Sequence, residues 1–420
     1  MRALLVLGAA LTASPALAEE PAGDEPVAEE EDGKVAVEGR VWGHVKTFAV
    51  GVVPYDHPLM PEEPVGQAFI DTRLNAELHV GEHVSAEVAH AVTTTIGSAA
   101  LQAASTGVAP QAPQLVDLGW EALDADSSTF SLQGRTDRLN VTLRTTGVQL
   151  TLGRQPVSFG SGLFFTPLDL VGRFTPATID TEYKPGVDAV RVDLFRGVST
   201  QGTAIVTWAD QPVGSDARTY EGLRAINAAL YGQATVGVTD IGLFTASIQG
   251  DPVFGTMVAT GVGPVALHGD ATVTVPTGED DADPYVRAVV GATGLPHWRL
   301  SLGGELYLQT LGTTDDAERL ALQQTDRFQR GELWLTGLAY AGLTANLELT
   351  PLVSVGFASI MNLTDPSLFL APSLSWSVSN NAQLAAGGYI GLGERPELLT
   401  LKSEFGTLPA VFFLQVRTYF

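Results

Sequence analysis

The sequence predicts an all-β protein, a transmembrane antiparallel β-barrel with an even number of strands. Three observations support this fold class. Apolar and polar residues alternate with a period of two along most of the chain. No stretch of about 18 uninterrupted apolar residues could form a transmembrane helix. The chain also ends on an alternating strand pattern with a terminal aromatic residue, and its 420 residues include no cysteine for disulfides or thiolate chemistry.

The N-terminus has the pattern of a secretory signal peptide over residues 1–18. Arg2 is its one basic residue, an apolar run extends from Ala3 to Leu11, and Ala16-Leu17-Ala18 forms a small-residue cleavage motif. Cleavage is predicted after Ala18. The mature protein is therefore expected to be exported.

Residues 19–33 form a strongly acidic leader. They contain eight of the 47 acidic residues and no basic residue. Such a segment has too little apolar surface to fold, so we predict a disordered periplasmic leader. Residues 34–420 retain 22 basic and 39 acidic residues, a formal charge of −17. This charge disfavours nucleic acid as a partner.

From residue 34 onwards the pattern is that of long, two-faced strands. In KVAVEGRVWGHVKTF, residues 34–48, the valines fall on one face, and His44 and the charged residues fall on the other. FIDTRLNAELHV, residues 69–80, repeats the pattern. Either a soluble sandwich or a membrane barrel could produce it. Many segments here reach ten or more residues, which favours the barrel because sandwich strands need only five or six.

Aromatic residues near expected strand ends also favour a membrane barrel. An interfacial aromatic girdle is typical of such proteins. Its candidate members are Trp208, Trp298, Tyr340, Trp376 and Tyr419.

The links between expected strands alternate between long and short, as in barrels with short periplasmic turns and longer external loops. The long links are residues 54–66, 94–128 and 155–186, and the short links are residues 80–83, 145–147 and 197–202. About 22 to 24 residues per strand and link predict 16 to 18 strands, within a range of 14 to 20. The barrel is expected to occupy residues 34–420.

The last strand, AVFFLQVRTYF, explains the terminal phenylalanine. Phe412, Leu414, Val416 and Phe420 share one face with Thr418. This ending resembles the C-terminal signal of Gram-negative outer-membrane barrels, which the barrel-assembly machinery recognises. The resemblance implies an outer-membrane location, with outer-membrane lipid, lipopolysaccharide and the assembly machinery as partners.

Basic residues gather in the middle of this acidic protein. Eight of the 23 basic residues lie between Arg135 and Arg196, against six acidic residues. Strand alternation predicts that four charged side chains of this stretch face the lumen: Arg138, Arg144, Arg191 and Asp193.

The long link from Gln155 to Gly186 is too rich in phenylalanine to extend freely into water. A link of about 32 residues in a compact domain needs a functional or packing reason. We expect it to fold into the barrel and narrow the lumen, and to present four charged side chains there: Arg154, Asp169, Arg173 and Lys184. Packing of its aromatic residues on the barrel rim is the alternative.

Two local resemblances accompany this link. Its position after the fifth expected strand resembles the constriction loop of general bacterial porins. The segment LGRQPVSFGSG, residues 152–162, is similar to strand-to-loop sequences of alginate-export-type channels. Both imply a channel and neither implies a particular substrate.

The sequence therefore favours a passive outer-membrane channel for small hydrophilic solutes, with no cofactor, and leaves a homo-oligomer open. An outer-membrane enzyme and an adhesive or structural barrel are the alternatives. FGSGL around Ser161 lacks the glycine spacing of a nucleophile elbow. His79 and His83 are expected to flank a turn rather than to bind a metal.

Overall fold

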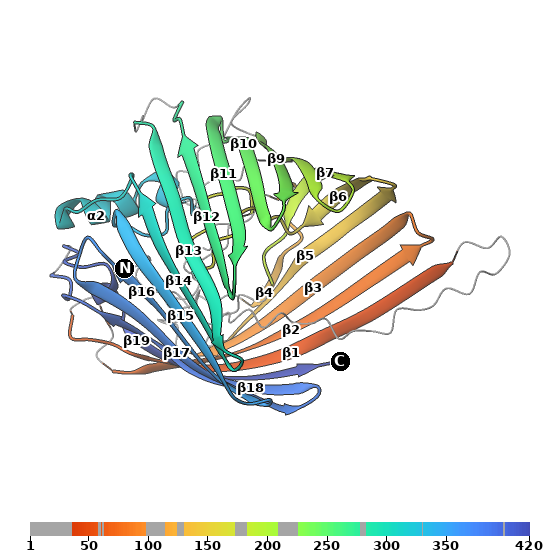
Figure 1. The fold of residues 1–420 in the computed structure, drawn as a ribbon. Coiled ribbons are helices and arrows are strands. Elements are labelled where there is room, and N and C mark those ends of the chain that lie inside the picture. The colour runs from red at the N-terminus through yellow and green to blue at the C-terminus, as the bar shows by residue number, and fades with distance from the viewer. Residues whose placement is uncertain are drawn as a thin grey trace.

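The computed structural model describes most of the predicted barrel. The described residues are 36–57, 60, 63–97, 114–123, 130–172, 183–208, 226–277, 283–329, 331–397 and 400–420. The expected signal peptide and acidic leader lie outside them. Figure 1 shows the strands inclined side by side in one continuous wall, with the short helix α2 at its rim.

Eighteen antiparallel strands close into a barrel, and the predicted all-β class and even strand number are confirmed. Closure follows from pairing of the last strand with the first, between His44↔Tyr419 and Val53↔Ala410. A further short strand, β4, pairs with β5 beside the wall. The first half comprises β1 (Val37–Val53), β2 (Val65–Val80), β3 (Val84–Gly97), β4 (Trp120–Leu123), β5 (Phe130–Thr145), β6 (Val148–Gln155), β7 (Val187–Arg196), β8 (Thr200–Trp208) and β9 (Ile226–Val236). The second half comprises β10 (Thr239–Ile248), β11 (Asp251–Val262), β12 (Val265–Thr274), β13 (Tyr285–His297), β14 (Leu300–Gln309), β15 (Ala339–Thr350), β16 (Val353–Asn362), β17 (Ser367–Ser379), β18 (Ala382–Leu392) and β19 (Ala410–Tyr419).

Short turns gather at one end of the barrel and most long links at the other, as the sequence predicts. The end with short turns is periplasmic in outer-membrane barrels. The β10–β11 link is an exception at the opposite end, because Gln249 and Gly250 alone join the two strands. Both residues have positive φ, 52° and 88°, as a tight type I′ hairpin turn requires.

The outward face of the wall is apolar. Leucine, valine and phenylalanine side chains stand exposed on successive strands, among them Leu74, Leu143 and Leu306. The four predicted assembly-signal residues, Phe412, Leu414, Val416 and Phe420, are all exposed on this face. Such a surface suits lipid contact, because burial of these side chains in hydrocarbon removes them from water.

The links that enter the barrel add helical turns and an apolar interior. α2 (Asp316–Gln323), α3 (Asp326–Gln329) and the 3₁₀ turn η3 (Phe405–Thr407) lie in these links. No helix of the described part is long and apolar enough to cross a membrane. Two clusters of buried apolar residues lie inside the wall, around Phe165 and around Leu168. The interior is therefore only partly polar.

Two residues of the expected aromatic girdle point inward instead. Tyr340 is fully buried in the interior cluster around Phe165. Tyr419 shares the inner face with Phe413 and Gln415 by strand alternation, and its ring lies edge-on to His44, 6.2 Å away. Proximity to a strand end does not determine which face a side chain takes, so the girdle assignment was wrong for both tyrosines.

Candidate channel constriction

The link between β6 and β7 crosses the interior of the barrel. We call residues 156–172 and 183–186 the inward segment. Ser161 donates to Asp270 on β12 from its backbone amide (2.7 Å) and its hydroxyl (2.8 Å), and the Gly162 amide also donates to Asp270 (3.2 Å). The amides of the next three residues, 163–165, all donate to the carboxylate of Glu305 on β14. Five consecutive amides thus bind two carboxylates of a distant part of the wall.

Aromatic packing fixes the segment on the same side. The ring of Phe165 stacks on Tyr307 with centroids 4.6 Å apart and planes inclined by 3°. Phe159 packs against Tyr231 and Phe244, each with centroids 5.4 Å apart. These phenylalanines are buried in the interior, away from the water at the two ends of the barrel. This burial explains how so apolar a link can belong to a water-exposed end of the protein.

The end of the inward segment lies against the opposite part of the wall. Tyr183 stacks on His44, with ring centroids 5.4 Å apart, and the Arg73 guanidinium carbon lies 4.1 Å from its ring centroid. Lys184, which the sequence predicts at the constriction, donates to Ser158 Oγ (2.8 Å) and pairs with Asp169, another predicted residue. This pair joins the two ends of the inward segment to each other.

The basic wall is our name for five residues of β1, β2, β5 and β19: Lys46, Arg73, Arg135, Arg138 and Arg417. Tyr183 lies over the first two, with Lys46 Nζ 5.3 Å and the Arg73 guanidinium carbon 4.1 Å from its ring centroid. Three acids lie beside it: Asp71 stands opposite Lys46 in the strand register and pairs with His44, Asp137 pairs with Arg73 and Arg135, and Glu87 pairs with Arg138. Asp137 reaches Arg73 from a bulge in β5, where Ala89 pairs with Arg138 and His90 with Thr136. Basic side chains from four strands thus gather on this part of the wall.

Arg138 is the predicted site residue that belongs to the basic wall. Its Nη1 donates to the backbone carbonyls of Asp137 and Lys184, each at 2.9 Å, so it also fixes the end of the inward segment. Arg191 and Asp193 face the interior on β7 and pair with each other at 2.8 Å. Arg144 lies next to the short β5–β6 turn and donates to Gln149 at 3.1 Å. These three therefore lie away from the basic wall.

Arg154 does not face the lumen, which corrects the prediction. In the strand register, Arg154 on β6 stands opposite Leu139 on β5 and opposite Asp188 on β7. Residues that stand opposite each other share a face of the sheet, and Leu139 faces outward, so Arg154 also faces outward. Its Nε donates to Asp188 at 2.8 Å, and its Nη2 donates to the backbone carbonyl of Val116. The incoming β3–β5 link covers this ion pair, so Arg154 is only 1% exposed. The other predicted residue, Arg173, lies outside the described residues.

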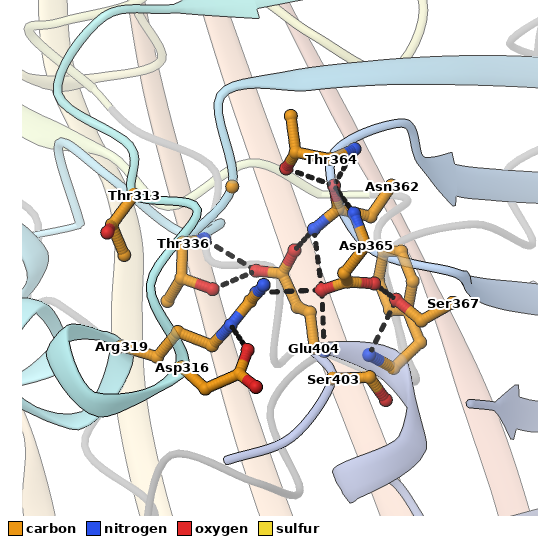
Figure 2. A network of polar contacts seen from close by, with 12 residues as sticks. Thr313, Asp316, Arg319, Thr336, Asn362, Thr364, Asp365, Ser367, Ser403 and Glu404 are labelled. Atoms are coloured by element: carbon orange, nitrogen blue, oxygen red, sulfur yellow. Dashed lines mark hydrogen bonds and ion pairs between the residues drawn. The ribbon is translucent and has the colours of Figure 1, made fainter. Parts of the chain in front are cut away.

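Two further links enter the barrel beside the inward segment and meet at Glu404. The α2 link, residues 310–338, contributes Thr336, whose hydroxyl donates to the Glu404 carboxylate at 3.0 Å. Asn362 at the end of β16 donates to it at 2.9 Å. Figure 2 shows these donors around the carboxylate of Glu404, which belongs to the β18–β19 link.

An ion pair extends this network to the rim. Arg319 on α2 pairs with Asp365 at 2.7 Å and with Asp316 at 3.3 Å. Asp365 also accepts from the backbone amide of Glu404 at 3.0 Å. Burial raises the pKa of the Glu404 carboxyl and the nearby Asp365 adds to this, although hydrogen bonds from Tyr340 and Thr336 act in the opposite direction. The network thus connects the α2 link, the β16–β17 link and the β18–β19 link to one another (Figure 2).

The described residues show no arrangement typical of a metalloenzyme or of a serine hydrolase. No group of three or more His, Asp or Glu residues among them could hold a metal ion. His79 pairs with Glu77 at 3.0 Å. The Ser161 hydroxyl donates to a carboxylate, and the neighbouring His268 contacts Glu305 at 2.8 Å. Ser161 thus contributes to anchoring the inward segment.

Sequence reasoning missed Lys46, Arg73, Arg417, Asp270 and Glu305. Each carries the polar signature of an inward strand position. Register brings Lys46 opposite Arg417, 371 positions away in the chain, through closure of β1 on β19. Alternation already placed Lys46, Arg73 and Arg417 on the polar face of their strands, without naming them as site residues, and it places Asp270 and Glu305 there too. It could not have shown which of them meet the inward segment.

A closed antiparallel barrel with an apolar outer wall, short turns at one end and a long link crossing its interior defines the class of porin-type outer-membrane β-barrels. Comparisons with solved structures show the same fold. No protein-family model and no curated protein sequence matches the chain.

Three solved structures illustrate the similarity. OccAB1 of Acinetobacter baumannii has a TM-score of 0.58 and 11% identity, with 93% of this chain and 98% of that chain covered. A BenF-like porin from Pseudomonas fluorescens Pf-5 has a TM-score of 0.58 and 10% identity, with 91% and 98% covered. OccK2 (OpdF) of Pseudomonas aeruginosa, solved in complex with glucuronate, has a TM-score of 0.55 and 9% identity over the same shares. At such identities the likeness establishes the fold.

Proposed function

We propose that this protein is a passive outer-membrane channel for small hydrophilic solutes, and that it favours anionic, carboxylated solutes. The observation that carries the proposal is the position of the inward segment, whose end lies against the arginines of the basic wall. A few fixed charges in a confined, low-dielectric passage act more strongly on a permeating ion than exposed charges, which are screened beyond about 8 Å in physiological salt. The glucuronate bound by the similar OccK2 carries a carboxylate and is consistent with this substrate class.

Ion selectivity tests the proposal. In planar bilayers with a salt gradient, we expect a reversal potential that indicates anion preference in the wild type. Arg138→Gln should shift it towards cations, because it removes one charge of the basic wall. Arg154→Gln is the matched control: it removes the same charge on the outward face and should leave the reversal potential unchanged. A cation-selective wild type, or equal effects of the two variants, would contradict the proposal.

The inward segment is proposed to narrow the lumen. Deleting residues 158–180 should then raise single-channel conductance, because the segment occupies interior volume. Heat-modifiable migration on gels should first show that the variant has folded. Unchanged conductance in a folded variant would mean that the segment lies outside the permeation path.

The chain is further proposed to enter the membrane through the barrel-assembly machinery and to contact lipopolysaccharide at its long links. The resemblance of its last strand to the assembly signal and its exposed residues Phe412, Leu414, Val416 and Phe420 support the first point. No specific observation favours an enzyme or an adhesin over the channel.

A further inference from the structure

Arg287 on β13 is a buried interior arginine outside the basic wall. It is 4% exposed and stands opposite Thr272 on β12 and Gln309 on β14 in the strand register. Its Nη1 donates to the backbone carbonyl of Glu332 at 3.1 Å. Within the described ranges, its Nε and Nη2 have no hydrogen-bond partner, and neither do the buried hydroxyls of Thr272 and Thr274.

The charge of Arg287 is also uncompensated by the acids nearby. A guanidinium stays charged at any physiological pH, and a buried charge without a counter-charge is strongly unfavourable. Asp251 and Glu332 pair with Arg327 instead, at 2.7 and 3.3 Å, and Glu332 also accepts from the Tyr285 hydroxyl. None of the ion pairs found among the described residues includes Arg287.

The unused donors match one kind of ligand. Nε and Nη2 form one edge of the guanidinium, and their spacing suits the two oxygens of a carboxylate. Thr272 and Thr274 lie on the neighbouring strand, and by alternation their hydroxyls share the inner face with Arg287. We propose that Arg287, Thr272 and Thr274 form a buried binding site for a small carboxylate. β14 to β18 separate it from the basic wall at β19.

The α2 link limits the size of this ligand. The backbone carbonyls of Glu332 and Leu335 accept hydrogen bonds from Arg287 and Gln309, so this link lies over the part of the wall that holds the site. We therefore expect formate or acetate to fit and larger sugar acids to be excluded. The site does not depend on permeation, because a barrel without conductance would retain it.

Thermal denaturation of the folded barrel in detergent tests the site. At constant ionic strength, sodium formate should raise the melting midpoint of the wild type in a saturable way, since a ligand that binds the native state stabilises it. Arg287→Met should weaken the apparent affinity by about 10- to 100-fold, the effect of losing charge-assisted hydrogen bonds. Arg191→Met is the control, because Arg191 already has Asp193 as its partner, and it should keep the formate response.

Three results would overturn the proposal: no response of the wild type, an equal response of Arg287→Met, or an equal effect of sodium chloride, which would show that the response is not specific for a carboxylate. Because Arg287→Met can impair folding, a second experiment uses the wild type alone. Crystals soaked in sodium formate should show density for a planar three-atom anion beside Nε and Nη2 of Arg287. A soaked crystal without that density would contradict the site.

Discussion

At the scale of single residues, the face that a charged side chain takes decides what it does. Arg138 and Arg154 belong to the same basic stretch of sequence, and both are almost fully buried. Arg138 faces the interior and holds the inward segment through the Lys184 carbonyl. Arg154 pairs with Asp188 on the outward face, under the β3–β5 link. The first is expected to act on permeating ions and the second to stabilise the wall.

Glu404 gives a prediction on pH dependence. Its pKa lies above the ordinary value of 4.5 because burial disfavours the charged carboxylate. A raised pKa means that its stabilising contribution is fully present below about pH 4.5 and is lost as the pH rises through the raised pKa. The thermal midpoint of the wild type minus that of Glu404→Gln should therefore fall as the pH rises from about 4.5 towards neutral.

Glu397→Gln is the control for this experiment, because the Glu397 side chain is 76% exposed in the same link. The difference in thermal midpoint between the wild type and Glu397→Gln should vary much less with pH. If the Glu404→Gln difference were equally flat between pH 4 and 7, burial of Glu404 would not control the stability of the joined links.

At the scale of elements, the inward segment depends on carboxylates that the barrel wall supplies. Asp270 and Glu305 accept the amides of residues 161–165 and are themselves 2% and 3% exposed. Hydrogen bonds to charged groups contribute about 1.5–3 kcal/mol each. Two acids can therefore hold the inward segment, whose described residues form no helix or strand that could fix its path.

The variant Asp270→Asn with Glu305→Gln should loosen the inward segment. We expect larger fluctuations of the single-channel current and a higher mean conductance, because amide side chains accept these hydrogen bonds less strongly. Glu87→Gln removes an interior negative charge without contacting residues 161–165, and so controls for charge alone. Current traces of the double variant that match those of the control would show that other contacts hold the segment.

At the scale of the whole molecule, the barrel closes at a seam between its first and last strands. The Phe420 amide donates to the Gly43 carbonyl at 3.0 Å, and the Gly43 amide donates to the Phe420 carbonyl at 2.8 Å. A Cβ at Gly43 would lie 2.4 Å from the backbone carbonyl oxygen of Arg73 and 2.7 Å from the Phe420 ring, so glycine is needed there. The terminal aromatic residue thus completes the seam.

Deleting Phe420 should reduce the yield of folded barrel and increase its unfolding rate, because two backbone hydrogen bonds and the ring contact at the seam are lost. Heat-modifiable migration in gels after refolding into vesicles measures both. Phe420→Tyr keeps the backbone and an aromatic ring, and should fold normally. A deletion variant with wild-type yield and wild-type unfolding would show that the seam does not need its last residue.

The sequence alone determined the class of fold, because alternation with a period of two depends on local geometry and records at each position which face meets lipid. It therefore predicted the outward face of Phe412, Leu414, Val416 and Phe420. The alternation of long and short links added the prediction of an even strand number. Only the tertiary structure decided how the interior is arranged. The inward segment meets Asp270 and Glu305, and the basic wall brings Lys46 beside Arg417, through contacts between residues far apart in the chain. Arg154 shows the limit most clearly: its charge suggested the lumen, yet the register of β6 with β5 and β7 places it outside with Asp188, where a link covers both. Strand register and link packing arise from long-range contacts, which a local pattern does not encode.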